Sequence, residues 1–490
     1  MIEVLVVAAP ACALLTGAVT WLARTAREAD LLNSAGATLT ALLTLILAAV
    51  AVADAAHPHH GSWWVLDAAG GAFLAVIAVV GLLSALLAPS QLATSARGLV
   101  RAARGRAMYY AAYHAFWAAL IAVPLVDNLG LAWLLVEATT GASALLVAYS
   151  GTRGALEAGW KYLVLTTFGL AIAMLGIIVL YVAIAPGDGT LATLDWQSIA
   201  RAAPSLQGGP AVAAFVLIVA GLATKVGWAP VHNWLPDAHS EAPPPVSALL
   251  SAALLPTVVL VTWRVVVALG PALSPGAASA LLLAFGLASL AVAVPFLWRA
   301  MAWKRLLAYS SLEHMGILAV GIGFATPLAS AGVVVHVAGH ALAKSLGFYA
   351  AGPLLRHAPR AHERAIHGLA FANPSTAGAV GVSLGALAAM PPSPLFVSEL
   401  LILLGGIAAH EIAVTAIAAT LLALGFLGLA RALVDGLVGE PRVKRWRSPR
   451  SGLRLRRLTV VCGTLMLALS VVACLLPGSS TIDHLMAGIA

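Results

Sequence analysis

The sequence predicts an all-α polytopic membrane protein with about fourteen transmembrane helices. Only 9% of its 490 residues are charged and 61% are hydrophobic, whereas about 25% of the residues of a soluble domain are charged. Runs of roughly 18 or more apolar residues, the length that a helix needs to cross a bilayer, recur along the whole chain. Each run must be helical, because backbone groups in lipid have to be hydrogen-bonded within their own segment.

The basic residues between the apolar segments support the number fourteen. Nearly all of the 27 Lys and Arg residues lie in loops that join an odd-numbered segment to the next even-numbered one, and only Arg201 lies in an opposite loop. Loops rich in Lys and Arg stay in the cytoplasm, so we expect a multi-pass protein of the cell membrane with both termini on the outer side. The segments are expected at about 2–22, 31–53, 70–88, 107–126, 128–149, 160–184, 211–235, 245–269, 276–297, 305–323, 326–355, 378–405, 410–435 and 458–477.

The composition argues against nucleic-acid binding and against cofactor chemistry. The basic stretch 442–457 is interpreted as a cytoplasmic loop that contacts the lipid bilayer through anionic headgroups, so no nucleic acid is expected as a partner. The three cysteines, Cys12, Cys462 and Cys474, lie in apolar segments without metal-ligand spacing. No Gly-rich nucleotide fingerprint follows a predicted strand. We therefore expect no cofactor in this subunit.

Prolines interrupt segments seven and twelve in a similar way. The first break spans 226–236, directly after Lys225, and the second spans 390–394, shortly before Glu399. Proline removes a backbone donor and kinks or breaks a helix. The two segments are five apart, an odd number, so a second copy would be inserted upside down. Proline-interrupted helices at matching places of two inverted halves point to a transport pathway, with ordinary kinking as the alternative.

Several ionisable side chains are expected within the apolar segments, where a charge costs roughly 2.5–3.5 kcal/mol. Burial disfavours the charged form of such a group and a nearby opposite charge favours it, so a lysine with a movable glutamate partner can take up and release a proton. His336, His340 and Lys344 are spaced by four residues and share one helix face, and histidine can relay protons. The predicted proton-translocation residues are Glu137, Lys225, His336, His340, Lys344 and Glu399.

Each of these residues also has a structural interpretation. Glu137 and Lys225 alternatively form a static ion pair that only fixes packing. His336 and His340 are alternatively core histidines. They have the i, i+4 spacing of a zinc helix, but the glutamate of the metalloprotease motif does not stand between them, so we expect no metal site.

Three further groups of polar residues have weaker interpretations. Glu313 and His314 lie early in segment ten, near the predicted cytoplasmic face, and are either a possible proton entry or an interfacial pair. Arg264, near the outer end of segment eight, is expected to extend to the membrane interface. The outer-loop histidines within 57–60 are expected to be solvated.

Residues 225–243 resemble the signature of the antiporter-like subunits of respiratory complex I and its relatives, the Mrp-type cation/proton antiporter complexes and the membrane-bound hydrogenases. Blocks at 304–311, 336–345 and 396–399 agree with this resemblance, which spans at least 105–405. The motif residues are Trp228, Pro230, His232, Pro236, Asp237 and His239.

Within this superfamily the chain most resembles the hydrogenase-4 component F type, through the stretches 137–140, 156–162 and 312–316. The resemblance implies two inverted five-helix repeats, segments four to eight and nine to thirteen. The implied divisions are an N-terminal three-helix segment at 1–106, the repeats at 107–269 and 270–435, and a basic loop with the last helix at 436–490.

The resemblance also implies roles for the ionisable residues. Glu137 and Lys225 resemble the coupling pair, the residues from His336 to Lys344 resemble the central relay, and Glu399 resembles the terminal site. One position departs from the pattern of the complex I members, which usually place a lysine or histidine inside segment eight. This chain has Pro256 at that position. The hydrogenase branch often lacks a charge there too, so the departure fits that branch, but it weakens the case for proton pumping.

The sequence therefore predicts a proton-translocating subunit that performs no bond chemistry itself. The implied partners are other membrane subunits and a peripheral redox module, either nickel–iron hydrogenase-like or complex I-like, whose electron transfer is coupled to proton movement. Two alternatives remain. One is a stand-alone or Mrp-type cation/proton antiporter subunit, and the other is a non-pumping membrane scaffold for an oxidoreductase.

Overall fold

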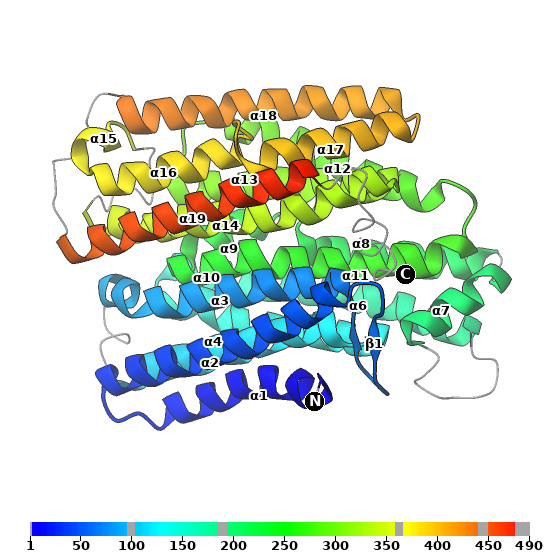
Figure 1. Ribbon diagram of the computed structural model, residues 1–490, viewed down its shortest axis with the longest axis horizontal. Helices are drawn as coiled ribbons and strands as arrows, with labels where there is room; N and C mark the ends of the chain where they lie inside the picture. The colour runs from blue at the N-terminus through cyan, green and yellow to red at the C-terminus, as the bar shows by residue number, and fades with distance from the viewer. Residues whose placement is uncertain are drawn as a thin grey trace.

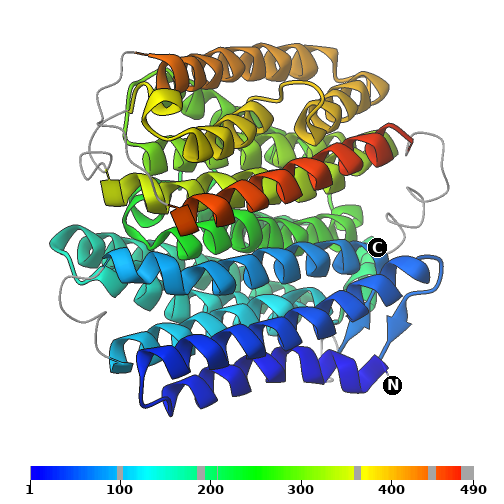
Figure 2. The ribbon, with the colours of Figure 1, turned by 60° about the vertical axis from the view of Figure 1, so that its left-hand side comes forward.

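The computed structural model describes residues 2–95, 103–184, 194–206, 208–357, 366–439 and 449–475. Its long helices run side by side, with the N-terminal helices at one edge, α18 (Ile412–Val438) at the other, and the C-terminal helix between them in both views (Figure 1, Figure 2). Within the described residues, thirteen helices are long and apolar enough to cross a membrane, and a shorter apolar helix accompanies them. The predicted all-α fold with about fourteen transmembrane helices is confirmed.

The membrane-length helices of the first half follow the predicted segments. They are α1 (Ile2–Trp21), α2 (Ala26–Ala53), α3 (Ala68–Ser95), α4 (Ala103–Ala122), α5 (Leu129–Val147), α6 (Arg153–Ile184), α8 (Gly209–Val226) and a continuous helix formed by α10 (Pro244–Leu249), the π-helix η6 (Leu250–Leu254) and α11 (Leu255–Leu269). Shorter elements connect them. These are β1 (His59–His60), β2 (Val65–Leu66), α7 (Trp196–Ala202), α9 (Leu235–Glu241) and the 3₁₀ turns η2 (Val123–Leu125), η3 (Ala148–Ser150), η5 (Ala203–Ser205) and η7 (Gly270–Ala272). The strands β1 and β2 form an antiparallel hairpin.

The second half contains the remaining long helices. They are α12 (Ala277–Leu297), α13 (Trp303–Phe324), α14 (Pro327–His357), α16 (Pro374–Leu387), α17 (Pro394–Ala408), α18 (Ile412–Val438) and α19 (Pro449–Leu475), with α15 (Leu369–Ala372) as a short connector. Parts of the predicted basic loop and of the C-terminal end, 440–448 and 476–490, lie outside the described residues. The predicted divisions at residues 106, 269 and 435 stay predictions.

Side chains that cap the helix starts fix where several helices begin. Asn128 accepts a hydrogen bond from the backbone N–H of Leu131 at the start of α5, and Asn373 does the same for Thr376 at the start of α16. Ser393 accepts from Phe396 N–H at the start of α17. Such caps satisfy backbone donors that the first turn of a helix leaves free.

The two predicted helix breaks are confirmed. Segment seven consists of α8, which ends at Val226, and the short α9, which begins at Leu235. Gly227 ends α8 with φ of 81°, and a Cβ there would collide with the Leu235 side chain, so the position requires glycine. Segment twelve likewise consists of α16 and α17, separated by residues 388–393.

The centre of the bundle is formed by α13, α14 and the continuous helix of α10, η6 and α11. All residues in the most apolar window of α13 are buried, 89% in that of the continuous helix and 83% in that of α14, whereas only 28% are buried in α1 and in α19. Helices α3 and α19, from opposite ends of the sequence, both pack against α14. A polar side chain that points inward from α13 or α14 is therefore enclosed by protein.

The helix that contains Pro256 is irregular at the place where a lysine or histidine was expected. Pro256 lies in the first turn of α11, directly after the wide turn of η6. Turns of this kind occur often at functional sites. One turn earlier, Ser251 lies 2.8 Å from Ser311 of α13, oxygen to oxygen. A pair of buried hydroxyl groups thus lies next to Pro256, where the resemblance to complex I subunits implied a lysine or histidine.

The prediction that Arg264 reaches the membrane interface is wrong. Its side chain is only 4% exposed and forms an ion pair with Asp67, at the start of α3. It also donates a hydrogen bond to the carbonyl oxygen of Pro124 at 3.1 Å. A counter-charge from a distant part of the chain, which the local sequence does not reveal, keeps this arginine inside.

Candidate functional site

Lys225 forms the first polar centre, between α5, α6 and α8. Its Nζ is buried and donates to Thr140 Oγ1 at 2.7 Å and to the Tyr162 hydroxyl at 2.5 Å. The ammonium also lies 4.6 Å from the centre of the Tyr162 ring. Tyr162 in turn shares a hydrogen bond of 2.8 Å with Ser143. The lysine is thus held by neutral hydroxyl groups and a ring face, which stabilise an ammonium group without a counter-ion.

Glu137 forms no ion pair with Lys225. Among the described residues, no carboxylate lies within 4.0 Å of the Lys225 nitrogen. Glu137 is half-buried on α5 and accepts a hydrogen bond of 2.9 Å from Thr167 of α6. The alternative of a static ion pair between Glu137 and Lys225 is therefore wrong, whereas their coupling role stays a prediction. Their charges still interact at longer range.

Most motif residues stabilise the break between α8 and α9. The Trp228 and Trp234 indoles donate to the carbonyl oxygens of Met315 and Thr224, each at 2.7 Å. Asp237 forms an ion pair of 3.0 Å with Arg305 at the surface. Pro236 occupies the first turn of α9, where its missing N–H costs nothing. These side chains position the helix ends around Lys225.

His232 and Pro230 lie at the rim of the break and not inside it. Pro230 is exposed, and His232 is half-buried in the same connecting segment, outside the membrane-spanning helices. Partial burial lowers the pKa of the His232 imidazole below its usual value, against a smaller raising effect of a hydrogen bond to the Pro230 backbone. His232 is therefore separated from the buried polar groups that follow Lys225.

His239 links the two halves of the protein. It lies on α9, fully buried, with its ring 6.3 Å from that of Trp234 and 5.7 Å from that of Phe348 on α14. The charges of Lys304 and Lys344 both reach it. Neither ring nitrogen has a hydrogen-bond partner among the described residues. His239 thus stands between the Lys225 centre and the helix that contains the predicted relay.

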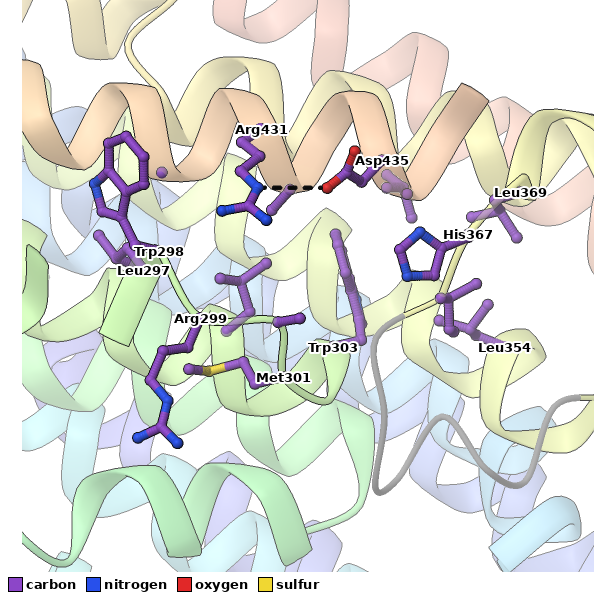
Figure 3. A pocket seen from close by; sticks show the side chains of 17 residues that line it. Leu297, Trp298, Arg299, Met301, Trp303, Leu354, His367, Leu369, Arg431 and Asp435 are labelled. Atoms are coloured by element: carbon purple, nitrogen blue, oxygen red, sulfur yellow. Dashed lines mark ion pairs between the residues drawn. The ribbon is translucent and has the colours of Figure 1, made fainter. Parts of the chain in front are cut away.

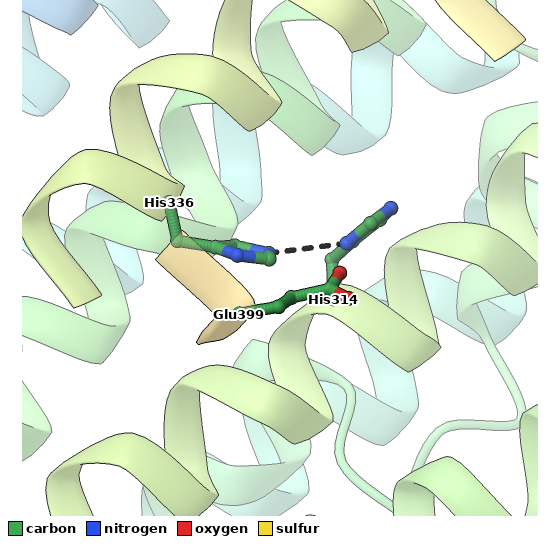
Figure 4. A group of neighbouring side chains, drawn as sticks. All are labelled: His314, His336 and Glu399. Carbon is green, nitrogen blue, oxygen red and sulfur yellow. Dashed lines mark hydrogen bonds between the residues drawn. The ribbon is translucent and has the colours of Figure 1, made fainter. Parts of the chain in front are cut away.

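The second polar centre consists of three histidines at the middle of the bundle. His314 on α13 faces His336 and His340 on α14, with ring centres 5.1 and 5.2 Å away. His314 Nδ1 lies 3.1 Å from His336 Nε2 (Figure 4). All three are 1% exposed or less. The predicted common stripe of His336, His340 and Lys344 is confirmed, since the two histidines face His314 and the lysine bonds to other residues of the same helix, α13.

Glu313 and His314 do not lie near a helix end, and that part of their prediction is wrong. They occupy the middle of α13, which begins at Trp303 rather than within the apolar run. Glu313 is 3% exposed, and its carboxylate lies against Gly425 of α18, where any Cβ would overlap it. The predicted bounds of segment ten, 305–323, nearly equal those of α13 and already placed both residues near the helix middle.

Lys344 and Glu399 complete the second centre. Lys344 Nζ donates to the Leu307 carbonyl oxygen at 2.5 Å and to the Ser310 hydroxyl. Glu399 lies on α17, just after the second break, and a carboxylate oxygen lies within 4.8 Å of nitrogens of His314 and His336. The structure therefore brings the predicted relay and the predicted terminal residue into one cluster.

Three participants were not expected from the sequence. Tyr162 and Thr140 bind the Lys225 ammonium, and Ser398 lies 2.9 Å from His336 Nδ1. Lys304, expected in a loop, is a buried residue in the first turn of α13 and donates to the Ser240 carbonyl oxygen. Hydroxyl groups inside apolar helices carry little signal alone, because they often bond only to their own helix.

A separate hollow lies at one end of the bundle, between α12, α16 and α18 (Figure 3). It offers about 60 Å³ of water-accessible space. Its rim includes Trp298, His367 and Arg431, and Arg431 is paired with Asp435 at 3.6 Å. None of the predicted proton-translocation residues lines it. The hollow is therefore distinct from the buried polar centres.

Comparisons with known proteins agree with this arrangement. A family model described as NADH:quinone oxidoreductase/Mrp antiporter, TM, matches residues 126–434. The chain is 32% identical over 385 residues to a protein named Hydrogenase-4 component F homolog from Methylacidiphilum infernorum, covering 78% of this chain and 80% of that protein. It is 28% identical over 421 residues to NADH-quinone oxidoreductase subunit N of Desulforudis audaxviator, covering 84% of this chain and 80% of that protein.

Solved structures share the fold. A chain of respiratory complex I from Thermus thermophilus superposes with a TM-score of 0.81 and 22% identity, covering 99% of each chain. A chain of the Mrp complex from Dietzia sp. superposes with a TM-score of 0.80 and 19% identity, covering 100% of this chain and 99% of that one. The chain belongs to the NADH:quinone oxidoreductase/Mrp antiporter membrane-subunit family.

Proposed function

We propose that this subunit translocates protons across the cell membrane, driven by electron transfer in a hydrogenase-4-like or complex I-like redox complex. The observation that carries the proposal is the line of buried ionisable side chains inside the apolar bundle. Placing charges at membrane depth is costly, and such groups usually mark ion or proton pathways. The proposed participants are Glu137, Lys225, His239, Glu313, His314, His336, His340, Lys344 and Glu399.

Unpartnered polar atoms support a hydrated route along this line. Among the described residues, both ring nitrogens of His239 and of His340 have no protein partner. The same holds for one carboxylate oxygen of Glu137 and one of Glu313. Buried polar atoms are almost always satisfied by protein or ordered water. Water molecules at these atoms would connect the titratable groups.

Lys225 is the proposed switch. Thr140 and Tyr162 accept its hydrogen bonds. When the amine is neutral, the two hydroxyl groups can still form hydrogen bonds with water, and Tyr162 keeps its bond to Ser143. Loss of the proton therefore leaves no buried charge behind. The released proton passes towards His239 and the histidines of α13 and α14, and Glu399 passes a proton outward.

We propose that Ser251 and Ser311 replace the lysine or histidine that was expected at Pro256. Their hydroxyl groups form a hydrogen bond between η6 and α13, and a hydroxyl can both donate and accept. Together with water they can pass protons without becoming charged. This argument favours pumping over the scaffold alternative.

Glu137 is the proposed point of contact with the rest of the complex. Its carboxylate is half-buried on a face that also exposes Leu134 and Phe168, at 54% and 68%. A carboxylate at membrane depth that faces lipid is costly, so we propose that another membrane subunit covers it. Electron transfer in a peripheral module would then change the field at Glu137.

The proposed orientation follows from the basic residues at one end of the bundle. Successive helices alternate in direction, so the turn between α1 and α2, the starts of α4 and α6 and the turn between α12 and α13 lie on one side. They contain Arg24, Arg27, Arg104, Arg106, Arg153 and Arg299. By the positive-inside rule this side is cytoplasmic and both termini are outside.

Electron carriers are proposed to reside in the partners. The cysteines lie on α1 and α19, at the edge of the bundle and at a surface-facing helix, and two of the three are partly or fully exposed. Iron–sulfur clusters need several cysteines close together. This subunit would supply positions and protonation sites, and no bond chemistry.

The test uses the purified complex in proteoliposomes with a pH-sensitive dye inside. We expect Lys225→Ala and Glu137→Gln each to abolish proton uptake while the subunits still assemble. Retained uptake in both variants would overturn the mechanism and favour a scaffold. Sodium- or potassium-dependent proton flux from the isolated subunit would instead favour a cation/proton antiporter.

A further inference from the structure

His314, His336 and Glu399 form a cluster with the composition of a metal site. Each offers one ligand atom, and these atoms all lie within 4.8 Å of one another. Figure 4 shows the three side chains converging from α13, α14 and α17. The sequence did not suggest this set, because only His336 belongs to the helical stripe that was considered for metal binding.

Ser398 fixes the orientation of the His336 ring. The Ser398 hydroxyl lies 2.9 Å from the Leu395 carbonyl oxygen, to which it donates, and 2.9 Å from His336 Nδ1. With its proton committed to the carbonyl, the hydroxyl oxygen accepts from His336 Nδ1–H. His336 Nε2 is therefore the nitrogen with a free electron pair, and it points at His314. Metal-binding histidines typically donate their second ring N–H in this way.

The spacing of the two imidazoles fits a tetrahedral ion. Two nitrogens bound at 2.0–2.1 Å to such an ion lie about 3.3 Å apart. His314 Nδ1 and His336 Nε2 are 3.1 Å apart. Because His336 Nε2 has the free electron pair, His314 Nδ1 carries the proton between the two rings. To bind the ion, His314 would have to change tautomer, with this proton moved to Nε2, and the Glu399 carboxylate would have to come slightly closer.

The surrounding charges also suit a cation. The carboxylates of Glu313 and Glu399 are close enough to repel each other, and a divalent ion between the histidines and Glu399 relieves that repulsion. The charge of Lys344 reaches His314 and opposes binding, whereas the carboxylate of Glu399, itself a ligand, favours it. Glu399 is only half-buried, whereas the two histidines are enclosed, so the ion would enter from the Glu399 side.

We propose that His314, His336 and Glu399 bind a divalent transition-metal cation of the zinc type, with water as the fourth ligand. The set of two histidines and one glutamate matches the ligands that zinc accepts in sites with an open position. The proposal goes beyond proton translocation and does not need it. Its consequence does rest on the proposed function, because an ion on these nitrogens blocks proton transfer between them.

The first test measures Zn²⁺ binding to the full-length protein in lipid nanodiscs, by competition with a fluorescent chelator. We expect one tight site that His314→Asn, His336→Asn and Glu399→Gln each weaken by more than about 100-fold. Ser398→Ala removes no ligand and should weaken binding about 10–100-fold, as loss of an outer partner does. Zinc X-ray absorption should show two imidazole ligands at about 2.0–2.1 Å.

The control addresses the exposed histidines near β1. His57 and His59 both lie within 3.3 Å of Asp54 oxygens at the surface and are a second place where zinc can bind. His57→Asn together with His59→Asn should leave the tight site unchanged. Loss of the tight site in that variant, or unchanged affinity in the His314 and His336 variants, overturns the proposal. Thermal unfolding at the wild-type temperature verifies that each variant is folded.

The second test separates this proposal from the proposed function. Zn²⁺ at concentrations that fill the site should inhibit proton uptake by the complex, and the inhibition should require tenfold or more zinc in Ser398→Ala. Ligand-dependent zinc binding without inhibition confirms the metal site and contradicts the role of these histidines in proton transfer. Absence of ligand-dependent binding overturns the metal site whatever the effect of zinc on uptake.

Discussion

Alanine at position 425 is expected to stop proton translocation without unfolding the protein. A Cβ at Gly425 of α18 would overlap the Oε1 atom of Glu313. The carboxylate would have to withdraw by on the order of 2 Å to reach an ordinary van der Waals distance. Misplacement by about 1 Å can cost about 10²-fold in a reaction that depends on alignment. We therefore expect proton uptake to fall at least tenfold in Gly425→Ala.

The stability of this variant should change little. Alanine is favoured over glycine inside a helix by roughly 0.8–1 kcal/mol, whereas an added methyl group in a packed interior typically costs about 1–3 kcal/mol. The atom in the way belongs to the flexible end of Glu313 and not to a backbone, so the cost should be at the low end. The free energy of unfolding should therefore fall by no more than about 2 kcal/mol.

The assay compares proton uptake and thermal unfolding in the same preparations of the complex. Gly378→Ala on α16 is the matched control, because a Cβ there would meet no atom within 4 Å. It should leave uptake unchanged. Wild-type uptake in a folded Gly425→Ala complex would show that the position of the Glu313 carboxylate does not matter and would refute the reasoning.

Three further substitutions test separate contacts. Tyr162→Phe should lower the free energy of unfolding by about 1.5–3 kcal/mol, the value of a hydrogen bond to a charged group. The same substitution should slow proton uptake. Tyr109→Phe is the control, because the Tyr109 hydroxyl has no partner in the described part of the chain. Arg264→Met should destabilise by about 3–5 kcal/mol in denaturant unfolding because it leaves the Asp67 charge buried alone, and adding Asp67→Asn should restore most of the loss; no restoration would contradict the ion pair. Ser251→Ala should slow uptake with an unchanged unfolding temperature, and unchanged uptake would exclude the serine pair from the route.

The fold was largely predictable because the bilayer restricts the choices. Apolar run length, the alternation of basic loops and the proline pattern indicated the helices, their number and the two breaks. The helix ends were less predictable. The α6 helix begins at Arg153, well before the predicted start at 160, since amphipathic first turns continue the helix beyond the apolar run.

The contacts within the site were much less predictable. Ionisable residues at membrane depth are conspicuous in a sequence, so Lys225 and the α14 stripe were found. Their partners were not, because a contact such as Lys225 with Tyr162 depends on how three helices rotate against each other. The same limit applies to Arg264, whose counter-charge comes from Asp67, almost 200 residues earlier in the chain. Local patterns contain no information about such distant pairings.

The separation of Glu137 from Lys225 is compatible with a coupling role for both. Opposite charges that are not in direct contact still interact through the protein interior, and the charge of Glu137 acts on Lys225 from beyond ion-pair distance. A direct ion pair would bind the lysine proton more tightly and would have to break in every cycle. In this structure Lys225 is bonded to neutral hydroxyl groups, so a change of field at Glu137 can alter its proton affinity without the rupture of a buried ion pair.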